Sequence, residues 1–244
     1  MAVPGDDATF TILGAGGFIG GTLAASLRRQ GWRVQAVTRA SLPLLLAGQR
    51  HAGHVIDCIG LTADFRSRPL ETAEAHVGLV ARCLAELRFS SFLLLSSTRV
   101  YSRAGATRED AAVPILATDP SDLYNVTKLA GEALCLSDPR AGSRVVRLSN
   151  VFGIGMPDTA FLGQVLREGR ASGTARFCQS PESAKDYISI AAVLRLLPAI
   201  AMSGQHRLYN VATGRNTSHG AIAARCTKSP AGRSPFAPNA PTVQ

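Results

Sequence analysis

The chain has few of the features that mark metal sites, export or membrane insertion. Its five cysteines are far apart in the sequence and form none of the closely spaced pairs that bind zinc. They stand at Cys58, Cys83, Cys135, Cys178 and Cys226. No apolar run reaches the ~18 residues of a membrane helix, and the N-terminus does not resemble a secretory signal. We therefore expect a cytoplasmic protein with no metal site and no membrane partner.

Lysine is scarce in a strongly basic chain. Only three of the 26 basic residues are lysines, and the formal net charge is +9. A basic, arginine-rich protein can bind nucleic acid. Here the arginines are scattered, without a dense run or interleaved aromatic residues. The pattern favours an enzyme that handles anionic ligands over a nucleic-acid-binding protein.

The length of 244 residues and a hydrophobic content of 46% fit one large domain, or one domain with a small appendage. Apolar runs rich in β-formers alternate with helical patterns, which predicts a doubly wound α/β fold with a parallel sheet. Strands are expected near 9–13, 32–37, 54–60, 91–97, 144–153 and 208–211. The longest predicted helix covers 69–88 without interruption.

Three glycines at three-residue spacing follow the first predicted strand and precede a helical stretch. Gly14 lets the chain turn sharply as it leaves the strand, and Gly17 lets the backbone approach phosphate oxygens. Gly20 lets the new helix pack closely on the sheet. A strand, a glycine turn and a helix in this order place a pyrophosphate at the helix N-terminus. The sequence therefore predicts a dinucleotide site.

The second predicted strand ends at Thr38 and Arg39, where a dinucleotide fold faces the adenosine ribose. NAD sites usually have an acidic residue at this place, and the chain has none. A hydroxyl followed by an arginine suits a 2′-phosphate better. The sequence therefore favours NADP modestly and leaves NAD open.

Tyr124 and Lys128 are four residues apart in a predicted helix and share one face of it. A lysine ammonium beside a phenol stabilises the phenolate and lowers the tyrosine pKa toward neutrality. Tyr124 is therefore expected to exchange a proton with an alcohol or a ketone. Hydroxyl groups that suit the substrate oxygen end the preceding strand, at Ser96, Ser97 and Thr98. Open α/β sheets bind their ligands at this end of the strands.

In this order the motifs resemble the extended short-chain dehydrogenase/reductase family, which includes nucleotide-sugar epimerases and dehydratases. The resemblance covers roughly residues 8–222. It rests on the stretches Gly14–Gly20, Ser96–Tyr101, Tyr124–Lys128, Arg147–Gly153, Lys185–Ile190 and Tyr209–Gly214. It implies a Rossmann-like fold and hydride transfer on a nucleotide-linked sugar.

The resemblance also assigns roles to single residues. Ser97 takes the place of the catalytic serine, with Thr98 as the runner-up, and it completes a catalytic set with Tyr124 and Lys128. Substrate contacts are implied for Ser97, Thr98 and Asn150, the last toward the diphosphate. Cofactor contacts are implied for Gly14, Gly17, Phe18, Ile19, Gly20, Thr38, Arg39, Ile59, Gly60, Tyr124 and Lys128.

Two positions that follow Ser97 reduce the number of reactions of this family that the chain is expected to catalyse. The 4,6-dehydratases of the family have an Asp-Glu pair where this chain has Thr98 and Arg99, so dehydration is not expected. GDP-fucose synthases have a cysteine at the place of Arg99. Epimerisation and simple keto reduction both remain open. His76 stands where the family usually has asparagine, and we expect it to be an ordinary polar helix residue.

The C-terminal part is short for this family. We expect a Rossmann core at 8–152, an abridged substrate lobe at 153–226 interleaved with the core, and a proline-rich, unfolded tail at 227–244. The short lobe keeps a second function open, that of a non-catalytic NAD(P)-binding regulator. The resemblance further implies a homodimer that forms through the helices at 72–88 and 120–137.

Overall fold

The computed structural model describes residues 9–48, 51–61, 64–172, 177 and 179–226. The predicted tail at 227–244 lies outside the described residues, as does Cys178. The chain forms two compact units. The first comprises 1–148 and 191–211, and the second comprises 149–190 and 212–244.

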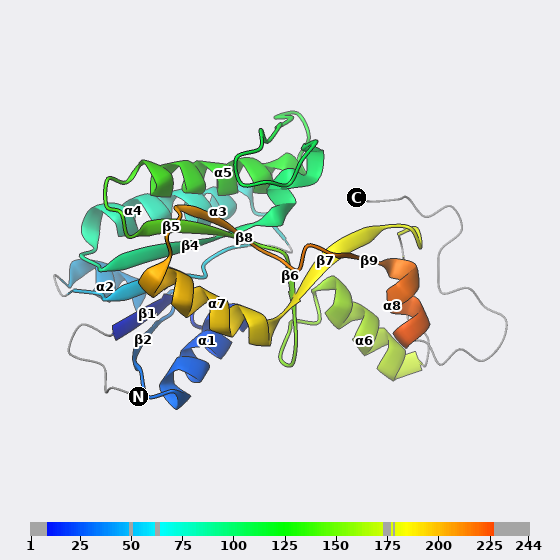
Figure 1. Ribbon diagram of the computed structural model, residues 1–244, viewed down its shortest axis with the longest axis horizontal. Helices are drawn as coiled ribbons and strands as arrows, with labels where there is room; N and C mark the ends of the chain where they lie inside the picture. Colours follow the sequence, from blue (N-terminus) through cyan, green and yellow to red (C-terminus); the bar gives the residue numbers. More distant parts are fainter. Residues whose placement is uncertain (1–8, 49–50, 62–63, 173–176, 178, 227–244) are drawn as a thin grey trace. The chain divides into compact units, whose positions relative to one another are not determined.

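A six-stranded sheet forms the centre of the first unit, with the strand order β2-β1-β3-β4-β5-β8 (Figure 1). All five neighbouring pairs are parallel, which confirms the predicted doubly wound sheet. The strands are β1 (Thr9–Leu13), β2 (Arg33–Val37), β3 (His54–Asp57), β4 (Ser91–Ser97), β5 (Ser143–Leu148) and β8 (Leu208–Val211). Side chains of β1, β3, β4 and β5 are buried almost throughout, as expected for strands covered on both faces.

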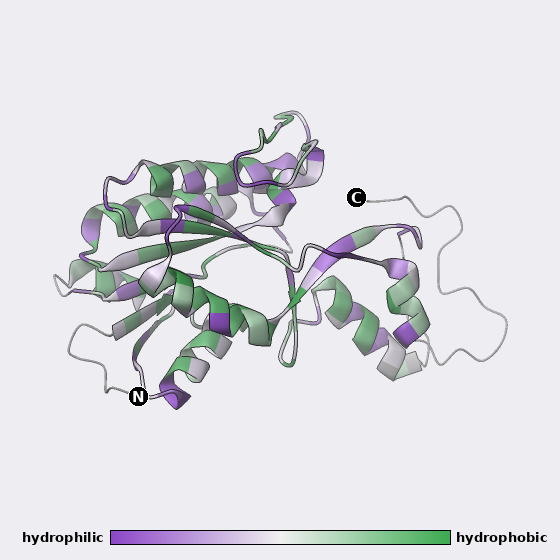
Figure 2. Ribbon diagram, viewed as in Figure 1, coloured by the Kyte–Doolittle hydropathy of each residue, from purple (hydrophilic) through white to green (hydrophobic). Residues whose placement is uncertain are grey.

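Helices cover both faces of this sheet. Figure 1 shows α4 and α5 on one face and α1 and α7 on the other. The helices of the first unit are α1 (Phe18–Arg29), α2 (Leu42–Ala47), α3 (Pro69–Ala73), α4 (Leu79–Glu86), α5 (Asp122–Ser137) and α7 (Ile190–Ser203). A 3-10 helix follows β4 at Thr98–Arg103. Helix α7 is hydrophobic along most of its length, as Figure 2 shows, and it buries Val193, Leu197 and Ala201.

The second unit has its own small sheet, with the strand order β6-β7-β9. Strands β6 (Asn150–Phe152) and β7 (Ala184–Ser189) are parallel, and β9 (Asn216–Ser218) is antiparallel to β7. Helices α6 (Phe161–Ser172) and α8 (His219–Cys226) complete the unit. Its core contains Val165, Phe177, Ile222 and Ala223.

Two predicted elements are interrupted in the structure. The expected helix at 69–88 contains a π-helical segment at Glu74–Gly78 between α3 and α4. The expected strand at 144–153 breaks at Ser149, because β5 belongs to the large sheet and β6 to the small one. Both breaks depend on partners far away in the sequence, which a local pattern does not contain. No helix in the described part of the chain has the length and apolar character needed to cross a membrane.

Candidate active site

The glycine turn between β1 and α1 is shaped by close backbone contacts. Gly14 has a φ of +72°, which favours glycine. A Cβ at Gly20 would lie 2.5 Å from the carbonyl oxygen of Gly14, so the first turn of α1 packs directly on the turn. A Cβ at Gly14 would lie 3.0 Å from the backbone of Cys58, just after β3. The turn is therefore fixed between the start of α1 and the end of β3, and the N-terminus of α1, at Gly17, has no side-chain cap.

The neighbouring strand ends frame this turn. The amide of Ala15 donates to the carbonyl oxygen of Val37, the last residue of β2, and Thr38 and Arg39 follow there. The amide of Thr38 donates to the hydroxyl of Ser41 at 2.9 Å, and the Arg39 side chain is exposed. Thr38 and Arg39 thus lie at the carboxyl end of β2, where the sequence predicts the adenosine ribose.

Ser97 and Tyr124 are brought together from β4 and α5. The Ser97 hydroxyl lies close enough to the Tyr124 phenol to favour its ionised form, and it accepts a hydrogen bond from the amide of Arg99 at 3.1 Å. Tyr124 is only 5% exposed, and its ring lies between the rings of Phe65 and His76, at centroid distances of 5.5 and 5.3 Å. The phenol is thus held against the predicted serine in a largely apolar setting.

The pKa of Tyr124 is raised above its usual value, whereas the sequence predicts a lowered one. Burial is the largest cause, since a phenolate is poorly solvated in this apolar setting. The hydrogen bond from Ser97 and the positive charge of Arg99 act in the opposite direction. The phenol is therefore protonated at neutral pH in this structure.

Lys128 is buried beside the segment that follows β3. Its ammonium donates to the carbonyl oxygen of Leu95 at 2.9 Å, and burial lowers its pKa to about 8, against the opposing charge of Asp57. A Cβ at Gly60 would lie 3.3 Å from Nζ of Lys128 and 3.3 Å from Nε2 of His76. Gly60 therefore lies against the ammonium, and its lack of a side chain leaves that space open.

His76 is a residue of this site that the sequence analysis left without a role. It lies in the π-helical segment and is 1% exposed. Its Nδ1 lies 2.9 Å from the Thr127 hydroxyl, and its Nε2 accepts from the amide of Leu61 at 3.3 Å. The Thr127 hydroxyl donates to the carbonyl oxygen of Leu123 at 2.8 Å, so Nδ1 carries the proton of a neutral imidazole. Burial lowers the pKa of His76 to about 3.

Asp57, at the end of β3, is a second buried group that the sequence analysis missed. It is 1% exposed, its Oδ1 accepts from the amide of Ile59 at 2.9 Å, and its Oδ2 has no hydrogen-bond partner among the described residues. Burial raises its pKa to about 6, while the Lys128 charge acts against this shift. The sequence does contain a signal for this group, since Asp57 stands inside an apolar predicted strand. An aspartate is rarely fully buried without a partner, so such a position indicates a special role.

Ser96 belongs to a buried polar network beneath the site and not to the site itself. Its hydroxyl donates to the Glu132 carboxylate, which also binds the Arg147 guanidinium at 2.6 Å. Arg147 donates further to the Tyr101 hydroxyl at 2.6 Å. Of the three hydroxyls at the end of β4, Ser97 is the one that acts on the phenol, and Thr98 begins the 3-10 helix.

Asn150 lies in the second unit, and its side chain is tied to the small sheet. The amide donates to the carbonyl oxygen of Asp186 on β7 at 2.9 Å. The Asp186 carboxylate accepts from the amides of Thr213 and Arg215, both at 3.0 Å, and so secures the loop before β9. The role implied for Asn150 toward a diphosphate stays a prediction.

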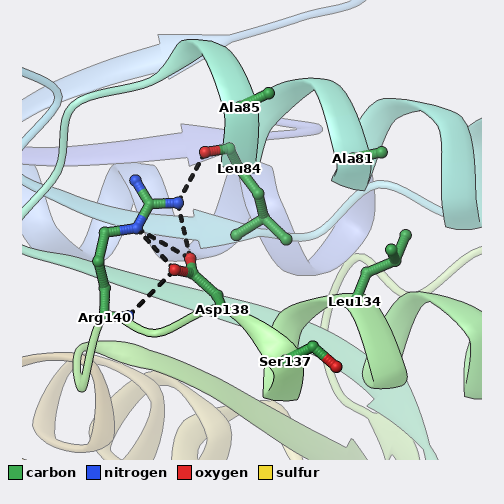
Figure 3. A pocket seen from close by; sticks show the side chains of 7 residues that line it. All are labelled: Ala81, Leu84, Ala85, Leu134, Ser137, Asp138 and Arg140. Carbon is green, nitrogen blue, oxygen red and sulfur yellow. Dashed lines mark hydrogen bonds and ion pairs between the residues drawn. The ribbon is translucent and has the colours of Figure 1, made fainter.

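A surface hollow of about 330 Å³ lies between α4 and α5, away from these residues. Figure 3 shows its lining, which consists of Ala81, Leu84, Ala85, Leu134, Ser137, Asp138 and Arg140. Arg140 closes one end, since its guanidinium donates to the carbonyl oxygen of Leu84 at 2.6 Å and to Asp138 at 2.6 Å. Tyr124 stands near the first turn of α5 and Ser137 ends it, about 20 Å apart along a helix. The hollow is therefore no part of the candidate active site.

Comparisons with known proteins agree with this architecture. MoeE5, solved with UDP-glucuronic acid and NAD, is 22% identical with a TM-score of 0.76, over 96% of this chain and 86% of that one. The UDP-glucuronic acid 4-epimerase of Bacillus cereus is 17% identical with a TM-score of 0.73, over 96% and 87% of the two chains. The UDP-glucose 4-epimerase of Thermotoga maritima is 14% identical with a TM-score of 0.71, over 96% and 89%. At these identities the likeness shows a shared fold.

The sequence itself gives the family. A comparison with curated protein sequences gives no match. The model of the NAD dependent epimerase/dehydratase family matches residues 10–212, which include the glycine turn, Ser97, Tyr124 and Lys128. This match covers most of the chain and confirms the resemblance found in the motifs. The chain belongs to the NAD-dependent epimerase/dehydratase family.

Proposed function

We propose that this protein is an NAD(P)-dependent enzyme that epimerises or reduces a nucleotide-linked sugar by hydride transfer. The observation that supports this most is the contact between the Ser97 hydroxyl and the Tyr124 phenol, with the Lys128 ammonium on the same helix beside Gly60. A proton-transfer residue, a group that holds the substrate oxygen and a fixed positive charge are the parts that such a reaction requires. The structural neighbours include proteins solved with UDP-glucose and with UDP-glucuronic acid.

The glycine turn suits the phosphates of a dinucleotide. The N-terminus of α1 has no side-chain cap, and the site for a Cβ at Gly16 is open space, so nothing in the turn covers the amides at the start of the helix. Gly14, Gly17, Phe18, Ile19 and Gly20 would hold the pyrophosphate end. Ile59, Gly60, Tyr124 and Lys128 would hold the nicotinamide end. The bound cofactor supplies the hydride acceptor and donor.

The protein's own residues would then control the proton. Tyr124 takes the proton of the sugar hydroxyl as the phenolate in the oxidative direction, and as the phenol it donates this proton in the reductive direction. The Ser97 hydroxyl holds the same substrate oxygen, with Thr98 next to it. Burial opposes formation of the phenolate, and the Ser97 hydrogen bond and the Arg99 charge reduce that cost. Lys128, with a pKa of about 8, is largely protonated at neutral pH and adds positive charge on the same helix face.

A panel of nucleotide sugars with NAD and NADP tests the proposal. We expect turnover by the wild-type chain, and a loss of at least about 100-fold in Tyr124→Phe, because general acid–base catalysis typically contributes 10²–10⁴-fold. Cofactor affinity, measured separately, should change little in this variant. Cofactor binding without turnover by either chain would instead support a non-catalytic NAD(P)-binding regulator.

We also propose that NADP binds in preference to NAD. The end of β2 carries the hydroxyl of Thr38 and the exposed guanidinium of Arg39, which suit a 2′-phosphate. Neither position has a carboxylate that would repel it. In Arg39→Ala the ratio of NADP to NAD affinity should fall about tenfold, while Arg29→Ala, an exposed arginine at the end of α1, should leave it unchanged. An unchanged ratio in Arg39→Ala would remove the basis for the preference.

A homodimer through α4 and α5 completes the proposal. The outer surface of these helices carries Leu134, which is 37% exposed beside the hollow of Figure 3. Leu134→Asp should shift the protein to the monomer in sedimentation equilibrium, whereas Leu44→Asp, on α2, should not. A monomeric wild-type protein at all concentrations would contradict this proposal.

A further inference from the structure

Two arginines stand beside Phe65, the ring that packs on Tyr124, and neither has an ion-pair partner among the described residues. The guanidinium carbon of Arg99 lies 5.4 Å from the centre of the Tyr124 ring and 5.0 Å from that of Phe65. The guanidinium carbon of Arg66 lies 4.5 Å from the same Phe65 ring. Both side chains are exposed, and both bind Ser121, Arg66 to its hydroxyl at 2.9 Å and Arg99 to its carbonyl oxygen at 3.4 Å.

The carboxylates of this neighbourhood are already paired elsewhere. Arg103 binds Asp122 at 2.8 Å and also binds Asp119. Arg68 binds Asp64 at 3.1 Å and, more loosely, Glu71 at 3.5 Å. In the described part of the chain, no carboxylate lies within ion-pair distance of Arg66 or Arg99. The two guanidiniums therefore have no ion-pair partner among the described residues, although Asp119 and Asp122 act on Arg99 from a greater distance.

This arrangement has an electrostatic cost that an anion would relieve. Partial burial is the largest cause that lowers the pKa of Arg99, and the charge of Arg66 lowers it further, while Tyr124, Asp122 and Asp119 act in the opposite direction. Two flexible cations of the same sign normally separate in water, but Phe65 and Ser121 hold these two close to one another. Guanidinium groups bind carboxylates through paired, charge-assisted hydrogen bonds, which favours an anionic oxygen group as the missing partner.

We propose that Arg66 and Arg99 bind a carboxylate on the sugar ring of the substrate. The inference rests on the proposed function, in which Ser97 and Tyr124 hold the reacting sugar hydroxyl. Arg99 is two residues beyond Ser97, and its amide donates to the Ser97 hydroxyl at 3.1 Å. A carboxylate on the ring carbon next to the reacting one would then be within reach of Arg99. The substrates are then nucleotide-linked uronic acids, not neutral hexoses.

A matched pair of substrates tests this proposal. UDP-glucuronate and UDP-glucose differ only in a carboxylate against a hydroxymethyl group, and both carry the same diphosphate. We expect wild-type kcat/KM to favour the uronate by about 10- to 100-fold, the contribution of hydrogen bonds to a charged group. In Arg99→Met and in Arg66→Met, the ratio of kcat/KM for UDP-glucuronate to kcat/KM for UDP-glucose should approach one. We expect this mainly because kcat/KM for the uronate falls. Arg28→Met, an exposed arginine at the far end of α1, should keep the wild-type ratio.

Three other results would overturn the assignment. An equal loss on both substrates would place the arginines on the shared diphosphate. A shift in the pH profile of kcat that is the same for both substrates would mean that Arg99 only adjusts the pKa of Tyr124. A preference for UDP-glucose in the wild-type protein would also contradict the proposal. Circular dichroism of each variant checks that the fold is retained.

A second measurement does not depend on the nucleotide. With [15N]arginine-labelled protein loaded with cofactor, free D-glucuronate should shift the Nε resonances of Arg66 and Arg99, assigned from the two methionine variants, and D-glucose should not. Shifts without turnover of any nucleotide sugar would support the anion site and contradict the proposed reaction. Turnover without such shifts, and without a uronate preference, would support the reaction and contradict the anion site.

Discussion

The imidazole Nδ1 of His76 and the hydroxyl of Thr127 lie 2.9 Å apart in the protein interior. This contact joins the π-helical segment to helix α5, one residue before Lys128. On its other side, the same ring accepts the amide of Leu61, just beyond Gly60. One neutral side chain thus connects the helix that carries Tyr124 and Lys128 to the segment that follows β3.

Replacement of His76 by phenylalanine should therefore cost stability. The Leu61 amide would lose its partner inside the protein, and an unsatisfied buried polar group costs about 1–3 kcal/mol. Urea unfolding should show a loss of this size in His76→Phe and a smaller one in His76→Asn, whose carboxamide still offers a donor and an acceptor. Thr127→Ser, which keeps the hydroxyl, serves as the control. Equal stability of His76→Phe and the wild-type protein would show that the two hydrogen bonds contribute little.

The buried carboxyl of Asp57 should give the protein a distinct pH dependence. Its pKa is about 6 in the folded protein, against an ordinary value of 3.8. The folded state binds this proton more tightly, so its stabilising contribution is complete below pH 3.8 and is lost as the pH rises through 6. Two pKa units correspond to about 3 kcal/mol. From pH 4 to pH 7, the free energy of unfolding of Asp57→Asn should thus rise by about this amount relative to wild type.

Chemical denaturation of wild type and Asp57→Asn at closely spaced pH values measures this difference. The other carboxylates are present in both proteins, so their effects cancel. Glu86→Gln, on the exposed surface of α4, gives the matched control. A constant difference between wild type and Asp57→Asn across the range would mean that Asp57 is ionised in the folded protein throughout.

The ion pair of Glu132 and Arg147 should be sensitive to the loss of either partner. Both residues are at most 5% exposed, and their closest side-chain atoms are 2.6 Å apart. Removing one member of a buried pair leaves an uncompensated charge and typically costs 3–5 kcal/mol. We expect a loss of about that size in urea unfolding for Arg147→Met. The double variant Arg147→Met/Glu132→Leu should regain part of the lost free energy of unfolding. If the losses of the two single variants simply add in the double variant, the two side chains are not coupled.

The close packing of Gly20 should make it intolerant of a methyl group. Its Cβ would meet the carbonyl oxygen of Gly14 at 2.5 Å, and both are backbone positions that cannot rotate away. Gly20→Ala should lower the melting temperature and weaken dinucleotide binding, because α1 must move away from the turn. Gly16→Ala is the matched control for stability, since its Cβ meets nothing within 4 Å. A melting temperature of Gly20→Ala equal to that of Gly16→Ala would contradict this reading.

The sequence by itself determined the parallel α/β fold, the glycine turn and the placement of Tyr124 and Lys128 on one helix face. These features depend on short-range patterns, namely apolar runs, glycine spacing and the helical repeat. Ser97 could also be placed, because a strand end and a motif fix its position. The assigned catalytic and cofactor roles of these residues remain predictions.

Only the tertiary structure decided which polar groups are buried together. Asp57 and His76 come from separate elements, and their pKa values follow from desolvation and neighbours that no local pattern contains. The same holds for Arg66 and Arg99, which stand 33 positions apart in the chain and meet over the ring of Phe65. Long-range packing sets the charge environment of Tyr124, and for that reason the direction of its pKa shift differed from the one that its spacing to Lys128 predicts.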